Sequence, residues 1–246
     1  MKLTILFTVL LFCAKTFANE VPALPIAHTV QKIEGWTVRV DSRLLNGVGA
    51  PHGERALKLL NARLVAIAVI MPEKPLEQLR AITIQLDLDH GKLEAMQYHP
   101  SAGWLKANGF SESLAKCVHI PSVESFLSPF ENHRMPWVVL HELAHAFHDQ
   151  VLGFEEPRVT KQWERFRGSG KYDSVLTSPG STREHYGINN PKEFFAEMTE
   201  CYFGSNDFYP FVTGELKQAE PEIFALMEEI WGPLPKKRRR SVVPAK

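Results

Sequence analysis

The residues best suited to chemistry are two histidines and a glutamate in the segment His141-Glu142-Leu143-Ala144-His145. Residues i and i+4 of an α-helix lie on one face, so both imidazoles can bind the same metal ion. This spacing on a helix is typical of a Zn²⁺ site. A glutamate beside the ion can take a proton from a zinc-bound water molecule. The motif therefore predicts metal-assisted hydrolysis. The alternative is an ordinary amphipathic helix in which two partnered histidines have the same spacing.

A catalytic zinc ion usually has three protein ligands and one position for water, so a third ligand must come from elsewhere. His148 follows on nearly the same helix face, but three ligands from one short helix would strain a tetrahedral site. We therefore expect His148 to lie beside the metal ligands or at the surface. A second helix is the better source, because Glu193, Glu197 and Glu200 are four and three residues apart and share one face. A solvated acidic face would show the same spacing.

Together these residues resemble a known family, the metalloprotease domain of anthrax toxin lethal factor. The likeness rests on H-E-L-A-H, on E-F-F-A-E beginning 48 residues after His145, and on Tyr186 seven residues before Glu193. It implies that Glu193 is the third zinc ligand and that Tyr186 donates a hydrogen bond to the oxyanion of the substrate. It also implies that Glu197 orients a zinc-bound histidine. The specific likeness covers about residues 138–202, and a toxin role does not follow from it.

The chain is also similar to uncharacterised exported bacterial proteins that combine an H-E-L-A-H helix with an N-D-F-Y-P-F segment, here residues 206–211. This second resemblance runs through most of the chain but implies no substrate. Zincins place a twisted sheet and a backing helix before the active-site helix, and an edge strand of the sheet pairs with an extended substrate. We therefore expect an α+β fold: a zincin-like metalloprotease domain with a mainly helical C-terminal half.

Hydrophobic patterning predicts the elements that position these residues. Alternating apolar residues predict strands, and apolar residues three and four apart predict helices. The expected strands are 36–41, 82–88, 96–98 and 117–120, and the expected helices are 54–71, 136–152, 191–202 and 221–231. The helix at 54–71 would back the sheet. Either short strand can be the substrate edge, and we favour 117–120 because it is closer in sequence to the active-site helix.

Residues 1–18 have the order of a cleavable secretory signal peptide: a basic start, an apolar run, and a small residue before Asn19. The apolar run is shorter than the roughly 20 residues that span a membrane, so we expect no stable span after cleavage. An uncleaved anchor would begin in the same way. The favoured location is secreted or periplasmic. Residues 19–235 are expected to form one domain, and 236–246 a basic, disordered tail.

The amino-acid composition and the charge of the chain limit the classes of protein to which it can belong. The 246 residues carry 28 Lys and Arg against 28 Asp and Glu, and 44% are hydrophobic, which is ordinary for a globular protein. Two basic residues lie in 1–18 and six in 236–246, so the expected domain holds 20 basic and 28 acidic groups. An acidic domain has no field to attract nucleic acid. Three cysteines exclude a disulfide scaffold, and the sequence leaves open whether Cys117 and Cys201 pair.

The function expected from the sequence is an exported, zinc-dependent metallohydrolase, an endopeptidase that acts as a monomer on a protein or peptide. His141, His145 and Glu193 would hold Zn²⁺, and Glu142 would act as general base. Tyr186 would stabilise the oxyanion. The alternative is a catalytically idle zinc protein that binds a peptide or a cell-envelope component in its cleft.

Overall fold

The computed structural model describes residues 27–235, which form a mixed sheet followed mainly by helices. The expectation of an α+β fold is confirmed. The expected signal peptide and the basic tail both lie outside the described residues. Across 27–235, no helix is both long and apolar enough to cross a membrane.

Five strands form the main sheet, in the spatial order β1-β2-β3-β5-β4. The three inner strands are parallel to one another, and the two edge strands are antiparallel to their neighbours. The strands are β1 (His28–Ile33), β2 (Trp36–Asp41), β3 (Thr83–Leu86), β4 (Gln97–Tyr98) and β5 (Cys117–Ile120). The predicted strand at 82–88 is thus shorter at both ends, and β1 was not predicted.

The expectation that 117–120 forms the substrate edge is wrong, because β5 lies inside the sheet and β4 is the edge strand. All four residues of β5 are buried, as is typical of a strand with neighbours on both sides. The chain leaves β3, forms β4, and then returns to insert β5 between them. Closeness in sequence to the active-site helix therefore does not give closeness in space.

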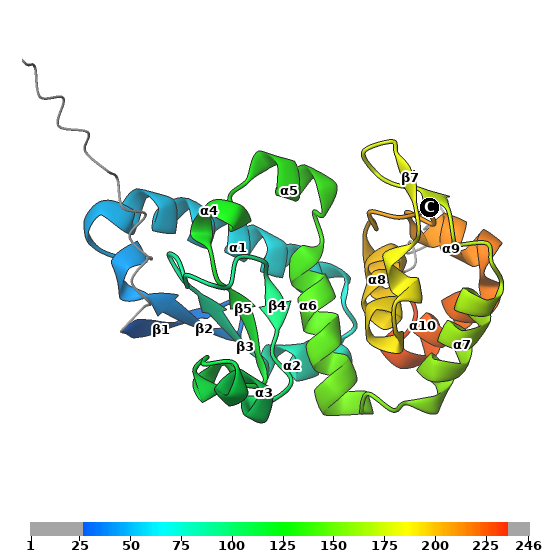
Figure 1. Ribbon diagram of the computed structural model, residues 1–246, viewed down its shortest axis with the longest axis horizontal. Coiled ribbons are helices and arrows are strands. Elements are labelled where there is room, and N and C mark those ends of the chain that lie inside the picture. Colours follow the sequence, from blue (N-terminus) through cyan, green and yellow to red (C-terminus); the bar gives the residue numbers. More distant parts are fainter. Residues whose placement is uncertain (1–26, 236–246) are drawn as a thin grey trace, which may run out of the picture.

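Helices cover one face of the sheet. The long helix α1 (Ala50–Ile70) begins four residues earlier than predicted and is followed by α2 (Glu73–Arg80). Trp36, Val38 and Val40 alternate along β2 and belong to the same buried core as Leu60 and Leu64 of α1. The backing helix predicted at 54–71 thus packs against the sheet, as Figure 1 shows.

The other face of the sheet is covered by the segment that connects β3 with β5. This segment contains α3 (Ala102–Ala107) and a 3₁₀ turn, η3 (Glu112–Leu114). A small separate apolar cluster, Leu93, Leu105 and Leu114, holds it together. Arg39, which points to this face from β2, donates to the carbonyl oxygen of Ser113 at 2.9 Å.

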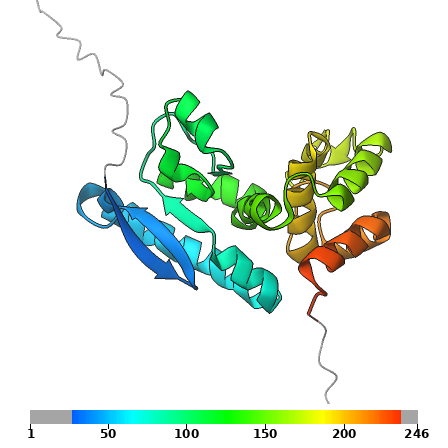
Figure 2. The same ribbon diagram turned by 90° about the horizontal axis from the view of Figure 1, so that it is seen from below.

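The H-E-x-x-H segment lies in α6 (Val138–Phe147), which sits between the sheet and the C-terminal helices (Figures 1 and 2). The predicted helix at 136–152 is not one regular helix. It continues as a π-helical turn, η4 (His148–Leu152), and ends at Gly153. Gly153 has φ of 84°, a left-handed conformation that favours glycine, and it directs the chain away from the helix.

The C-terminal half is built from four helices and a small hairpin. Two of the helices, α8 (Pro191–Phe203) and α10 (Pro221–Trp231), agree with the predicted 191–202 and 221–231. The sequence patterns did not predict α7 (Pro157–Gly168), α9 (Thr213–Ala219) or the hairpin of β6 (Val175–Leu176) and β7 (Thr182–Arg183). Two short helices, α4 (Val123–Phe126) and α5 (Pro129–Arg134), precede α6. One hydrophobic core runs through the sheet, α6 and these helices.

Candidate metal centre

The facing sides of α6 and α8 carry the three predicted metal ligands. His141 and His145 lie one turn apart on α6. Glu193 lies in the first turn of α8, where the side chain of Asn190 accepts hydrogen bonds from backbone N–H groups and caps the helix. This cap fixes where the helix begins and so fixes the position of Glu193 relative to α6.

The ligand atoms form a compact triangle. His141 Nε2 lies 3.1 Å from His145 Nε2, and Glu193 Oε2 lies 3.3 Å and 3.2 Å from these two atoms. Zn²⁺ bonds of about 2.0–2.1 Å in a tetrahedron separate neighbouring ligand atoms by about 3.3 Å. The three donors thus fit a zinc ion in both spacing and chemistry. The group is one of those among the described residues that can hold a metal ion.

The second ring nitrogen of His141 has a carboxylate partner. Its Nδ1 lies 2.6 Å from Glu200 Oε1, a contact that holds the ring with Nε2 directed at the ligand triangle. The nearest oxygen of Glu197 lies 3.8 Å from the same nitrogen, beyond hydrogen-bond distance. The hydrogen bond to a histidine that was expected of Glu197 is therefore made by Glu200. Glu200 is seven residues after Glu193, nearly two full helical turns, so it returns to the same side of α8.

The pKa shifts of these side chains are consistent with Glu200 as the hydrogen-bond partner of His141. Burial lowers the pKa of His141, but contacts with Glu193 and Glu200 raise it well above its usual value. Burial likewise raises the pKa of Glu193, but both histidines hold it far below the ordinary range. Burial and the charge of Glu200 raise the pKa of Glu197 well above its usual value. A raised pKa favours the protonated form of Glu197, which makes it a poorer charged acceptor for His141.

Glu142 is held by the edge strand of the sheet. Its Oε2 accepts a hydrogen bond of 2.8 Å from the backbone N–H of Tyr98 in β4. Burial raises the pKa of Glu142, and the neighbouring histidines only partly oppose that rise. A carboxylate with a raised pKa is a stronger base near neutral pH, which suits a general base. The sequence offered no sign of this link between Glu142 and β4.

Tyr186 lies on the same cleft as the ligand triangle. It begins a short 3₁₀ turn, η5 (Tyr186–Ile188), that directly precedes α8. The buried ring of His185 caps this turn, because its Nδ1 accepts a hydrogen bond of 2.9 Å from Gly187 N–H. Tyr186 is 42% exposed, and burial together with the charge of Glu193 raises its pKa. Its hydroxyl therefore stays protonated at neutral pH and can donate a hydrogen bond.

The cleft around these residues has a volume of about 670 Å³. One wall is the segment 94–98 with Pro100, and the other includes Tyr186 and Glu193. Arg134 and Asp207 line its end and form an ion pair of 3.2 Å between Nη1 and Oδ2. Burial and the charge of Glu200 raise the pKa of Asp207 to about 6. The N-D-F-Y-P-F segment thus contributes to this site through Asp207, a role the sequence analysis did not assign.

His148 is neither at the surface nor hydrogen-bonded to a metal ligand. It is fully buried, between the rings of Phe154 and Phe195, and neither of its ring nitrogens has a partner within the described residues. Burial lowers its pKa to about 4. The expectation of a surface position is therefore wrong. His148 lies in the π-helical turn, which carries its ring into the core behind α6.

The two cysteines after residue 18, Cys117 and Cys201, are both free thiols buried in different elements. Comparison of the chain with models of protein families, with curated proteins and with solved structures finds no match.

Proposed function

We propose that this protein is a zinc-dependent hydrolase that cleaves peptide bonds. The observation that carries the proposal is the ligand triangle of His141, His145 and Glu193, with atom separations of 3.1–3.3 Å, beside the buried carboxylate of Glu142. A structural zinc site usually has four protein ligands, whereas a catalytic site usually has three and keeps one position for water. A three-ligand set that opens on a cleft supports the catalytic alternative.

Each residue has a distinct part in the proposed reaction. A zinc ion held by the triangle would polarise the substrate carbonyl as a Lewis acid and would lower the pKa of a water molecule to about 7. Glu142 takes the proton from the attacking water and passes it to the leaving amine. The Tyr186 hydroxyl donates a hydrogen bond to the substrate oxygen as negative charge develops on it. Glu200 holds His141 in the tautomer that binds the metal.

A peptide is the proposed substrate because the cleft borders β4, the edge strand of the sheet. β4 pairs with β5 on one side, and on its other side Tyr98 N–H reaches Glu142. An extended peptide laid along this edge would place a carbonyl group near both the ligand triangle and Glu142. The signal-like residues 1–18 support export, and we propose that the enzyme acts in the periplasm or outside the cell.

A Glu142→Gln variant tests the proposal. It keeps the hydrogen bond acceptor for Tyr98 N–H but removes the base, so we expect one equivalent of zinc at the triangle and a loss of hydrolysis of at least about 10²-fold. The measurement is zinc content together with cleavage of a broad peptide library, and Glu77→Gln, an exposed glutamate on α2, is the matched control. Wild-type protein that binds zinc at His141 and His145 but cleaves no peptide would favour the idle zinc protein instead.

A further inference from the structure

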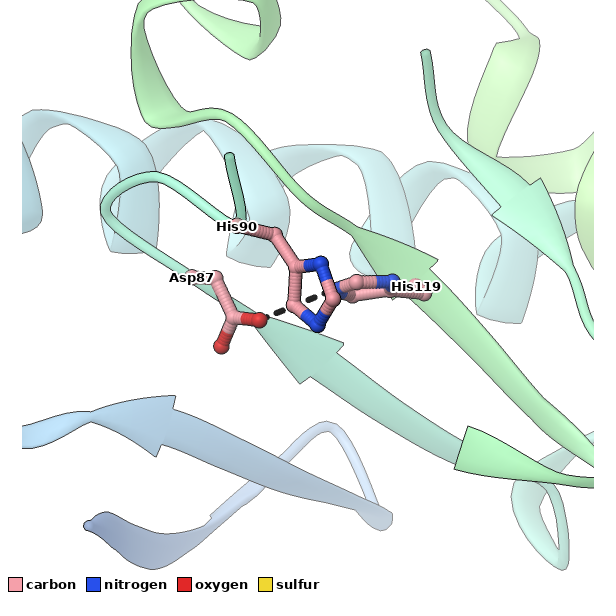
Figure 3. Close-up of side chains that lie close together, drawn as sticks. All are labelled: Asp87, His90 and His119. Atoms are coloured by element: carbon pink, nitrogen blue, oxygen red, sulfur yellow. Dashed lines mark hydrogen bonds and ion pairs between the residues drawn. The ribbon is translucent and has the colours of Figure 1, made fainter. Parts of the chain in front are cut away.

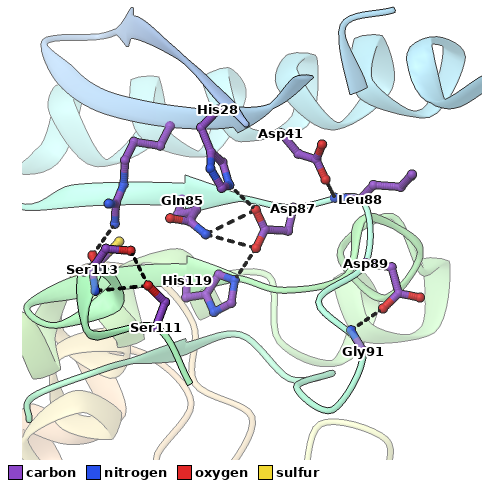
Figure 4. Close-up of polar contacts among 12 residues, drawn as sticks. His28, Asp41, Gln85, Asp87, Leu88, Asp89, Gly91, Ser111, Ser113 and His119 are labelled. Carbon is purple, nitrogen blue, oxygen red and sulfur yellow. Dashed lines mark hydrogen bonds and ion pairs between the residues drawn. The ribbon is translucent and has the colours of Figure 1, made fainter. Parts of the chain in front are cut away.

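A second group of histidines surrounds a buried aspartate on the sheet face away from α1. Asp87 follows β3 and is fully buried, as is His119 in β5 (Figure 4). His90 and His99 lie near them and are 6% and 2% exposed. None of these residues lines the cleft that contains the ligand triangle. These residues therefore form a separate cluster of side chains whose types can bind metal ions.

The carboxylate of Asp87 is the centre of this cluster. Its Oδ2 lies 2.8 Å from His119 Nε2, and its Oδ1 lies 2.7 Å from Nε2 of His28 at the start of β1. The amide nitrogen of Gln85 contacts both oxygens, at 3.2 Å and 3.0 Å. These donors hold the pKa of Asp87 below its usual value although burial raises it. A charged carboxylate is thus fixed among imidazole rings inside the protein.

Hydrogen bonding among the described residues does not account for the buried position of the His90 ring in this cluster. Its ring packs edge-on against the ring of His119, with 4.8 Å between the centroids. Its Nδ1 is buried and has no hydrogen-bond partner within the described residues. In the view of Figure 3 this ring lies in front of the contact between Asp87 and His119. A buried, unpartnered imidazole nitrogen beside a carboxylate and a second imidazole is expected where a cation binds.

His119 also has the support that a metal-binding histidine needs. When one ring nitrogen binds a metal, the other carries a proton and usually donates it to a neighbour. His119 Nδ1 lies 3.2 Å from His99 Nε2, which can accept that proton. With the proton on Nδ1, the Nε2 of His119 that faces Asp87 can bind an ion.

We propose that Asp87, His90 and His119 bind a second divalent metal ion of the Zn²⁺ class. One ligand atom from each residue lies within 4.8 Å of the other two. A tetrahedral zinc site places neighbouring ligand atoms about 3.3 Å apart, so an ion would draw the three side chains closer together, and within the described residues the buried Nδ1 of His90 has no hydrogen bond to break. Two imidazole nitrogens and one carboxylate oxygen are donors that suit zinc.

We expect this ion to stabilise the segment that forms one wall of the cleft. His90 lies near the start of the loop that leads from β3 to β4, and the end of this loop together with β4, residues 94–98, lines the cleft. An ion at Asp87, His90 and His119 would tie the start of this loop to both β3 and β5. The ion would therefore stabilise the folded protein and take no part in any reaction.

Metal analysis of the full chain tests the proposal without altering the cluster. The variant His141→Ala/His145→Ala removes the ligand triangle, and we expect it to retain one equivalent of Zn²⁺ after reconstitution and dialysis. Co²⁺ in place of Zn²⁺ should give the visible absorption of a tetrahedral site with nitrogen ligands. Zinc should also raise the melting temperature of this variant. Zero equivalents of retained metal in this folded variant would overturn the proposal, whatever the fate of the proposed hydrolase activity.

A second set of variants assigns the retained ion to the cluster. His90→Phe in the same background keeps an aromatic ring against His119 but removes the donor, and we expect it to lose the ion, the cobalt absorption and the zinc-dependent rise in melting temperature. His52→Phe makes the same change at an exposed histidine of α1 and should retain all three. Retention of the ion in the His90 variant would show that it binds elsewhere and would reject the site.

Discussion

At the scale of single residues, the neighbouring carboxylates Glu197 and Glu200 have different roles. Glu200 accepts the short hydrogen bond from His141, whereas the nearest oxygen of Glu197 lies 3.8 Å from the same nitrogen and its pKa is raised. We expect Glu200→Gln to lower zinc affinity by about 10- to 100-fold, because the amide no longer fixes the tautomer of His141 as a carboxylate does. Glu197→Gln, the matched control, resembles the protonated acid and should change affinity little. Zinc titration with a competing chelator measures both, and the reverse order would return the orienting role to Glu197.

Tyr186 offers a test of oxyanion stabilisation that does not disturb folding. Its side chain is 42% exposed, so removal of the hydroxyl leaves no buried cavity. We expect Tyr186→Phe to lower kcat for peptide cleavage by about 10²- to 10³-fold, with little change in KM or zinc content, because the lost hydrogen bond forms only in the transition state. Steady-state kinetics give the two constants separately. A rise in KM at unchanged kcat would instead assign Tyr186 to substrate binding.

At the scale of elements, the site depends on how closely α6 approaches α8. Gly204 ends α8, and a Cβ built there would lie 2.2 Å from the indole of Trp137, which precedes α6. Only glycine allows this contact between the beginning of one helix and the end of the other. The contact therefore contributes to the alignment of the metal ligands on the two helices.

We expect Gly204→Ala to destabilise the protein by about 1–3 kcal/mol, the usual range for an overpacked contact. Metal binding should weaken with it, since the indole must move and α6 with it. Gly214→Ala in α9 is the control, because a Cβ there meets nothing within 4 Å and alanine favours helix. Chemical denaturation of the two variants checks the comparison, and equal stabilities would contradict the role given to Gly204.

At the scale of the whole molecule, several buried histidines make stability depend on pH. Burial lowers the pKa of His99 and of His148 to about 4, and that of His185 to about 3. An unfolded chain protonates histidine near pH 6.5, so between pH 6.5 and 4 the unfolded state binds more protons than the folded state. The free energy of unfolding should therefore fall as the pH drops through this range and should be fully recovered above it.

His148 permits the clearest test of this dependence, since its ring nitrogens make no hydrogen bonds within 27–235. We expect His148→Leu to reduce the slope of unfolding free energy against pH by up to about 1.4 kcal/mol per pH unit, the value for one proton. Urea denaturation at several pH values, on metal-free protein, measures the slope. His133→Leu, at an exposed position on α5, should keep the wild-type slope. An unchanged slope in the His148 variant would mean that other groups take up the protons.

The sequence by itself determined the features that depend on one element at a time. Helical periodicity puts His141 and His145 on one face, and capping signals around Asn190 place the start of α8 within a residue of where it lies. The α+β class also follows, because patterns of period 2 and period 3.6 can be read locally. The short helices and the two-residue strands could not be predicted, since they are too brief to carry a period.

Only the tertiary structure decided how the elements meet. The position of β4 at the edge depends on its pairing with β5. The hydrogen bond from Tyr98 to Glu142 and the choice of Glu200 over Glu197 depend on contacts between residues 44 and 59 positions apart. The cluster of Asp87, His90 and His119 arises in the same way, from a strand end, a loop and a neighbouring strand. Local pattern sets which way a side chain points from its own helix or strand. Packing of the common core sets which other side chain it then faces.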